Sequence, residues 1–63
     1  MSNRITYREA KEILNAHFGT LAARAALSQV YLLTGGNKWI ARNTVFEIGV
    51  KAQQELEVLY EQS

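Results

Sequence analysis

Few side chains in this sequence could carry out acid–base or metal chemistry, and they are widely separated. His17 is the only histidine, and the chain has no cysteine. No carboxylate or second imidazole stands at metal-ligand spacing from His17, which falls on the apolar side of a predicted helix, near its end. A packed histidine next to the carbonyl end of that helix explains this position better than a ligand or a general base. We therefore expect no metal site.

The glutamates and the glycine pair do not suggest a reaction either. Glu9 and Glu12 suit the cap and the surface of a first helix, and the glutamates after residue 50 are spread around the last helix. The stretch from Gly35 to Lys38 lacks the glycine spacing and the following Ser or Thr of a phosphate-binding loop. We predict a protein with no enzymatic activity and no cofactor.

Length and composition favour one small domain that pairs with itself. The chain has 63 residues, of which 48% are hydrophobic, and a core of this size rarely stabilises a chain without a disulfide, a metal or a partner. The polar opening predicts no secretory leader, and the longest weakly charged run, residues 21–36, is too short to span a bilayer. We expect a homodimer without a membrane span, located in the cytoplasm.

Charge is distributed unevenly along the chain. Residues 1–42 hold six Lys or Arg and two Glu, a balance of +4, whereas residues 43–63 hold one Lys and four Glu, a balance of −3. This division would allow the acidic C-terminal part to lie near a basic neighbour, within one chain or across a dimer.

Apolar spacing predicts three helices. The capping-box pattern from Thr6 to Glu9 opens the first, over about 6–18, and Gly19 is a natural stop. The second covers about 20–34. The third covers about 38–62 and is either continuous or interrupted near Asn43. The predicted fold is an all-α, three-helix small domain: a helical hairpin with a long C-terminal helix, expected to be dimeric.

The second predicted helix is apolar almost all round, since only Arg24, Ser28 and Gln29 interrupt it. A helix of this kind is normally buried, and two other short helices cannot cover every side of it. Large aromatic residues such as Trp39 and Phe46 could fill the core or dominate an interface with a partner. We predict a protein interface at Leu27, Val30, Tyr31, Trp39, Phe46, Leu56 and Leu59.

The alternative hypothesis is a small DNA-binding regulator of the helix-turn-helix type, with Gly35 and Gly36 at the turn. A steep helix crossing favours a small residue about four positions before the turn glycine, where this chain has the bulky Tyr31 or Leu32. The glycine pair is therefore better explained as a hinge, and binding of nucleic acid as the weaker hypothesis. Its candidate phosphate contacts are Arg4, Arg8, Lys11, Lys38 and Arg42.

Taken whole, from the opening MSNRITYREAKEILNAHFG to the ending QQELEVLYEQS, the chain resembles the short helical proteins encoded in the early exonuclease-to-excisionase region of lambdoid phages. The resemblance implies a role early in infection, in which contacts with a host or phage protein influence the host or the choice between lysis and lysogeny. It brings no catalytic residues.

Overall fold

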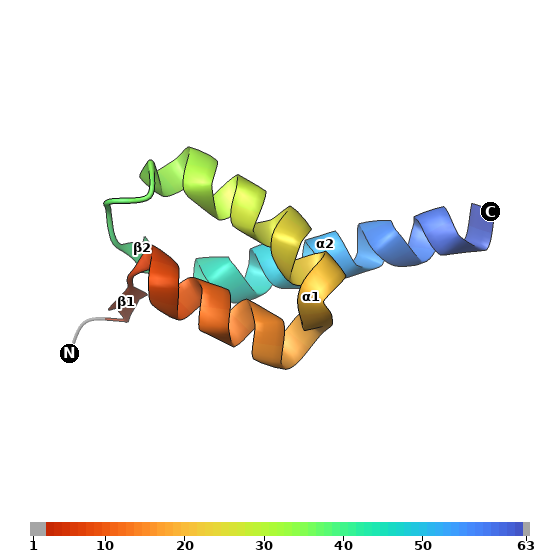
Figure 1. Ribbon diagram of the computed structural model, residues 1–63, viewed down its shortest axis with the longest axis horizontal. Coiled ribbons are helices and arrows are strands. Elements are labelled where there is room, and N and C mark those ends of the chain that lie inside the picture. Colours follow the sequence, from red (N-terminus) through yellow and green to blue (C-terminus); the bar gives the residue numbers. More distant parts are fainter. Residues whose placement is uncertain (1–2, 63) are drawn as a thin grey trace.

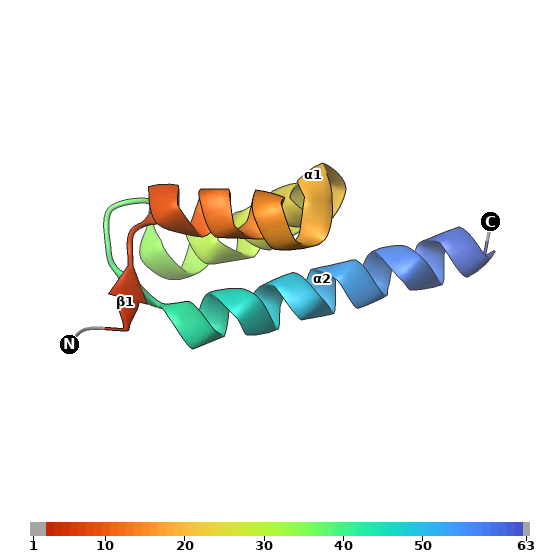
Figure 2. The same cartoon turned by 90° about the horizontal axis from the view of Figure 1, so that it is seen from below.

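The computed structural model describes residues 3–62, which form two helices and one small sheet. In chain order the elements are β1 (Arg4–Ile5), α1 (Tyr7–Thr34), β2 (Ile40–Ala41) and α2 (Arg42–Gln62). Helix α1 is bent into two arms, and α2 packs along one side of them (Figures 1 and 2). The prediction of an all-α, three-helix domain is therefore wrong, because the described residues form two helices and a two-stranded sheet.

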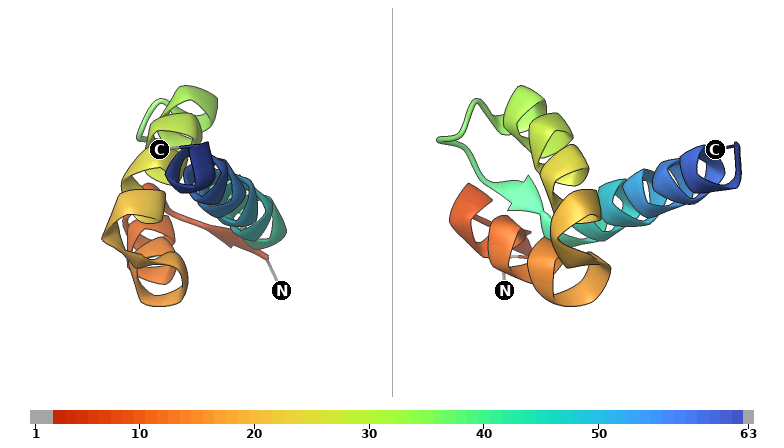
Figure 3. Two further views of the ribbon diagram at one scale, coloured as in Figure 1. Left: turned by 90° about the vertical axis from the view of Figure 1, so that its right-hand side faces the viewer. Right: turned by 45° about the vertical axis from the view of Figure 1, so that its right-hand side comes forward.

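Gly19 explains why the first two predicted helices are one bent helix. Its backbone angles, φ 84° and ψ 167°, depart from helical geometry inside α1 and lie in a region open essentially only to glycine. The helix resumes directly afterwards, so α1 changes direction without an intervening loop (Figure 3). We call residues 7–18 the N-terminal arm and residues 20–34 the C-terminal arm.

The predicted N-cap at Thr6, which is one half of the capping box, is confirmed. Thr6 is the N-cap, and the backbone N–H of Glu9 donates a hydrogen bond to Thr6 Oγ1 at 3.2 Å. The two side chains also meet, with 3.3 Å between Thr6 Oγ1 and Glu9 Oε1. These contacts satisfy a backbone donor that the first turn of a helix otherwise leaves unpaired.

The glycine pair ends α1. Gly35 adopts a left-handed conformation with φ 65°, and its N–H donates to the carbonyl of Tyr31 at 2.7 Å, which is a common way for a helix to stop. The buried Thr34 hydroxyl donates to the carbonyl of Val30 and accepts from the N–H of Gly36, both at 3.0 Å. These bonds fix the turn that leads the chain to β2.

The sheet was not predicted from the sequence; it joins residues 4–5 to residues 40–41. Strands β1 and β2 are antiparallel, with Arg4 opposite Ala41 and Ile5 opposite Ile40. Since residues 40–41 are extended, the last helix begins at Arg42 and not near residue 38 as predicted. Asn43 lies in its first turn and does not interrupt it.

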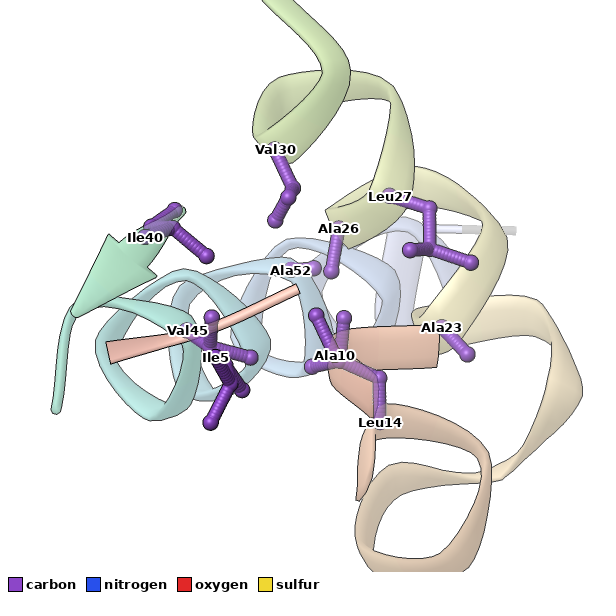
Figure 4. Packing of buried hydrophobic residues seen from close by; sticks show 10 residues of the cluster. All are labelled: Ile5, Ala10, Leu14, Ala23, Ala26, Leu27, Val30, Ile40, Val45 and Ala52. Atoms are coloured by element: carbon purple, nitrogen blue, oxygen red, sulfur yellow. The ribbon is translucent and has the colours of Figure 1, made fainter. Parts of the chain in front are cut away.

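The core lies between the two arms of α1, the sheet and the first half of α2. All four elements contribute to one apolar cluster (Figure 4). Gly49 marks a close approach of α2 to the N-terminal arm, because a Cβ built there would lie 2.7 Å from Phe18 Cδ2 and 2.8 Å from Leu14 Cδ2. The cluster consists of Ile5, Ala10, Leu14, Ala23, Ala26, Leu27, Val30, Ile40, Val45 and Ala52.

The last part of α2 extends beyond this core. Ala52 is the last buried residue of the helix, and Leu56 is the only one of residues 53–62 that is even half-buried. Figures 1 and 2 show this segment, which we call the α2 overhang (residues 53–62), projecting past the bend of α1. It accounts for much of the 42 Å length of a molecule only 20 Å by 15 Å across.

Candidate interaction surface

The structure divides the predicted interface residues between the interior and the surface. Val30 is fully buried and Leu27 nearly so, and both pack in the core. Phe46 and Leu56 are half-buried. Tyr31, Trp39 and Leu59 remain accessible to a partner; their exposures are 54%, 61% and 61%.

Phe46 belongs to an aromatic cluster beside the core. Its ring centroid lies 5.2 Å from that of His17 and 6.3 Å from that of Phe18, both in edge-on arrangements. These contacts join the end of the N-terminal arm to the first half of α2. They give His17 a packing role at an exposed position, and they engage the Phe46 ring within its own chain.

Large apolar side chains gather on the surface at two ends of the molecule. Around the end of α1, Leu32 is 77% exposed and lies near the exposed Leu33 and Trp39 in the sequence. On the α2 overhang, Leu59 is flanked in the sequence by Val58 and Tyr60, which are also exposed. Several of these positions were not among the predicted interface residues. The full set of exposed large apolar residues among residues 3–62 is Leu21, Tyr31, Leu32, Leu33, Trp39, Val50, Val58, Leu59 and Tyr60.

The five residues predicted to contact phosphates are all exposed, but they do not form one group. They are Arg4, Arg8, Lys11, Lys38 and Arg42. The pairing of Arg4 with Ala41, together with a 2.7 Å hydrogen bond from the N–H of Arg42 to the carbonyl of Asn3, brings Arg4 and Arg42 to the same edge of the molecule. Lys38 lies in the turn after α1. Lys11 instead lines a groove formed by α1 alone.

That groove lies between the two arms of α1. It has a volume of about 520 Å³, and only α1 residues line it. Lys11 stands on one arm and Arg24 on the other, and the lining contains no carboxylate. We call it the α1 groove; it is lined by Tyr7, Lys11, Arg24, Leu27, Ser28, Tyr31 and Leu32.

Two tyrosines from opposite arms meet at the α1 groove. The rings of Tyr7 and Tyr31 are 6.0 Å apart and nearly perpendicular, at 82°, an arrangement that favours the contact of a ring edge with a ring face. The ring of Tyr31 also lies against Gly36, where an added Cβ would come within 2.8 Å of Tyr31 Cε2. The ring is thus held on two sides, and a left-handed glycine makes room for it.

Sequence reasoning found only part of this groove. It identified Tyr31, Leu27 and Lys11, but for separate reasons, and treated Arg24 only as an interruption in an apolar helix. The bend at Gly19 brings Lys11 and Arg24 to the same groove. A glycine after an amphipathic helix was the available signal, but it indicates a helix end and a sharp bend equally well.

Other kinds of site find little support in the described part of the chain. Residues 3–62 contain no group of three or more His, Cys, Asp or Glu placed to hold a metal ion. Within the same residues, neither helix combines the length and apolar character needed to cross a membrane.

Comparison of the chain with protein-family models, with curated proteins and with solved structures gives no match in any of the three.

Proposed function

We propose that this chain is a small non-enzymatic regulatory protein that works as a helical homodimer and acts by binding another protein. The observation that supports this most is the apolar surface left exposed, above all at the two ends of the molecule. Nine large apolar side chains are exposed among residues 3–62, although the whole chain has only 63 residues. Burying such surface contributes about 25 cal/mol per Å², and large exposed apolar surface commonly marks a binding site.

The position of the exposed residues also favours pairing. Ala25, Leu32 and Leu33, from the predicted helix that was apolar all round, are all exposed. The core engages the other side of the same arm, where Ala26 and Val30 are buried. A second copy, or a partner protein, would remove the exposed side from water.

The partner that we propose is a host or phage protein, and the setting is the cytoplasm of an infected cell. This part of the proposal rests on the resemblance to lambdoid early-region proteins. The chain would then modulate host functions, or the choice between lysis and lysogeny, through protein contacts.

Capture of a partner from infected and uninfected host cells tests the role. Trp39, which is 61% exposed, is outside the core, so Trp39→Ala should leave helicity unchanged and still remove the captured protein. Asn43→Ser, at an exposed polar position four residues further along the chain, serves as the control and should retain it. Equal capture by the wild type and the Trp39→Ala variant would contradict the proposed role of this surface.

Titration with duplex DNA tests the alternative of a DNA-binding regulator. Binding through phosphates weakens steeply between about 50 and 200 mM salt, and Arg42→Ala or Lys38→Ala should then reduce it. We expect no binding to duplex at low salt. Salt-sensitive binding that these substitutions abolish would favour the DNA-binding function over the one proposed.

A further inference from the structure

Two surfaces of the molecule combine apolar side chains with charge of opposite sign. The α2 overhang contains Glu55, Glu57 and Glu61 and no Lys or Arg, a balance of −3 over residues 53–62. The α1 groove has Lys11 and Arg24 on its two arms and no carboxylate in its lining. Each surface therefore presents the charge that the other lacks, and charges arranged in this way favour one specific orientation of two partners.

The apolar parts of the two surfaces also match. Val58 and Leu59 each lie one helical turn from Glu55, on an exposed face of α2 that Lys51 and Gln54 also line at its end nearer the core. Leu27 and Leu32 supply apolar lining in the α1 groove. A helix face with two aliphatic residues and a carboxylate one turn away fits a groove with an apolar lining and cations on its sides.

The overhang cannot fill the groove of its own chain. Helix α2 is unbroken from Arg42 to Gln62, and it carries the C-terminus to the end of the molecule opposite the end of α1 (Figure 1). A straight helix that points away cannot turn back into the space between the arms. The groove of a second copy has no such restriction.

The groove is already shaped before anything binds. The Tyr7–Tyr31 contact and the packing of Tyr31 on Gly36 hold its aromatic end, and the Gly19 bend sets the two arms. A preformed site lowers the ordering cost of association.

We propose that the α2 overhang of one copy docks in the α1 groove of a second copy, and that the second copy's overhang docks in the groove of the first. The pairing is closed by a two-fold axis, so each contact occurs twice. This assigns an interface to the homodimer and therefore rests on the proposed function.

A charge-swap experiment tests the docking. One variant reverses the groove (Lys11→Glu with Arg24→Glu), and the other reverses the overhang (Glu55→Lys with Glu61→Lys). In each variant alone, groove and overhang no longer carry opposite charge, so the dimer dissociation constant measured by sedimentation equilibrium should rise about tenfold or more. In an equimolar mixture, the two variants should form a mixed dimer. In it, the reversed groove of one variant receives the reversed overhang of the other, and the remaining contact pairs an unchanged groove with an unchanged overhang. Circular dichroism follows helicity in all samples.

Single reversals at exposed positions outside both surfaces, Lys38→Glu and Glu47→Lys, are the controls and should pair as the wild type does. If the wild type is a dimer but the mixture shows no recovery, or if the reversals leave pairing unchanged, the docking is wrong while the homodimer stands. Assemblies larger than a dimer would contradict the closed arrangement. A wild type that stays monomeric would overturn the homodimer of the proposed function itself.

Discussion

Replacing Gly19 by L-alanine should destabilise the fold through backbone strain alone. The angles of Gly19, φ 84° and ψ 167°, cost an L-residue about 1–3 kcal/mol. An added Cβ meets no atom within 4 Å, so no steric clash adds to this cost. Alanine also restricts the unfolded chain, which offsets about 0.4–1 kcal/mol. The expected net loss is about 1–2 kcal/mol.

Thermal unfolding followed by circular dichroism, at one fixed protein concentration, measures this loss. For a domain of this size, 1 kcal/mol corresponds to about 4–8 °C in Tm, so we expect Gly19→Ala to lower Tm by about 5–15 °C. The fixed concentration matters because the Tm of a pairing protein depends on it.

D-alanine in place of Gly19 is the matched control, and a chain of 63 residues can be made by chemical synthesis. The mirrored preferences of a D-residue place these angles in its ordinary extended region, so only the restriction of the unfolded chain remains. The protein with D-alanine at this position should be as stable as the wild type or more stable by up to about 1 kcal/mol. Equal destabilisation by the two enantiomers, or full stability of the L-alanine variant, would refute the assigned role of Gly19.

Three further substitutions test local contacts by denaturant unfolding. Thr6→Ala removes the N-cap of α1 and should cost about 1 kcal/mol; no change would contradict the cap. Thr34→Val removes both hydroxyl hydrogen bonds that end α1 and should cost about 1–3 kcal/mol, whereas a neutral effect would mean that they contribute nothing. Gly49→Ala gains about 1 kcal/mol of helix propensity but crowds Phe18 and Leu14, at about 1–3 kcal/mol. We expect a net loss of about 1 kcal/mol, and a stabilised variant would show that Phe18 moves aside freely.

Local signals in the sequence predicted the features that depend on a few neighbouring residues. The N-cap at Thr6 and the helix end at the Gly35–Gly36 pair are set by hydrogen bonds within one turn.

Features that depend on distant residues could not be predicted in the same way. Strands of two residues have no alternation to detect, so the pairing of Ile5 with Ile40 was missed, and with it the start of α2 at Arg42. Gly19 can end a helix or bend it, and only the packing of both arms against α2 selects the bend. The same ambiguity concealed the groove between Lys11 and Arg24. Val30 was placed at an interface because its helix is apolar almost all round, although the fold encloses this residue completely.

The most direct test of the central claim is the mass of the wild-type chain in solution, measured by sedimentation equilibrium at micromolar concentration. The proposed homodimer predicts a mass twice the 7.1 kDa of one chain, which should fall toward that value on dilution. A mass of 7.1 kDa throughout, with full helicity retained, would contradict the account.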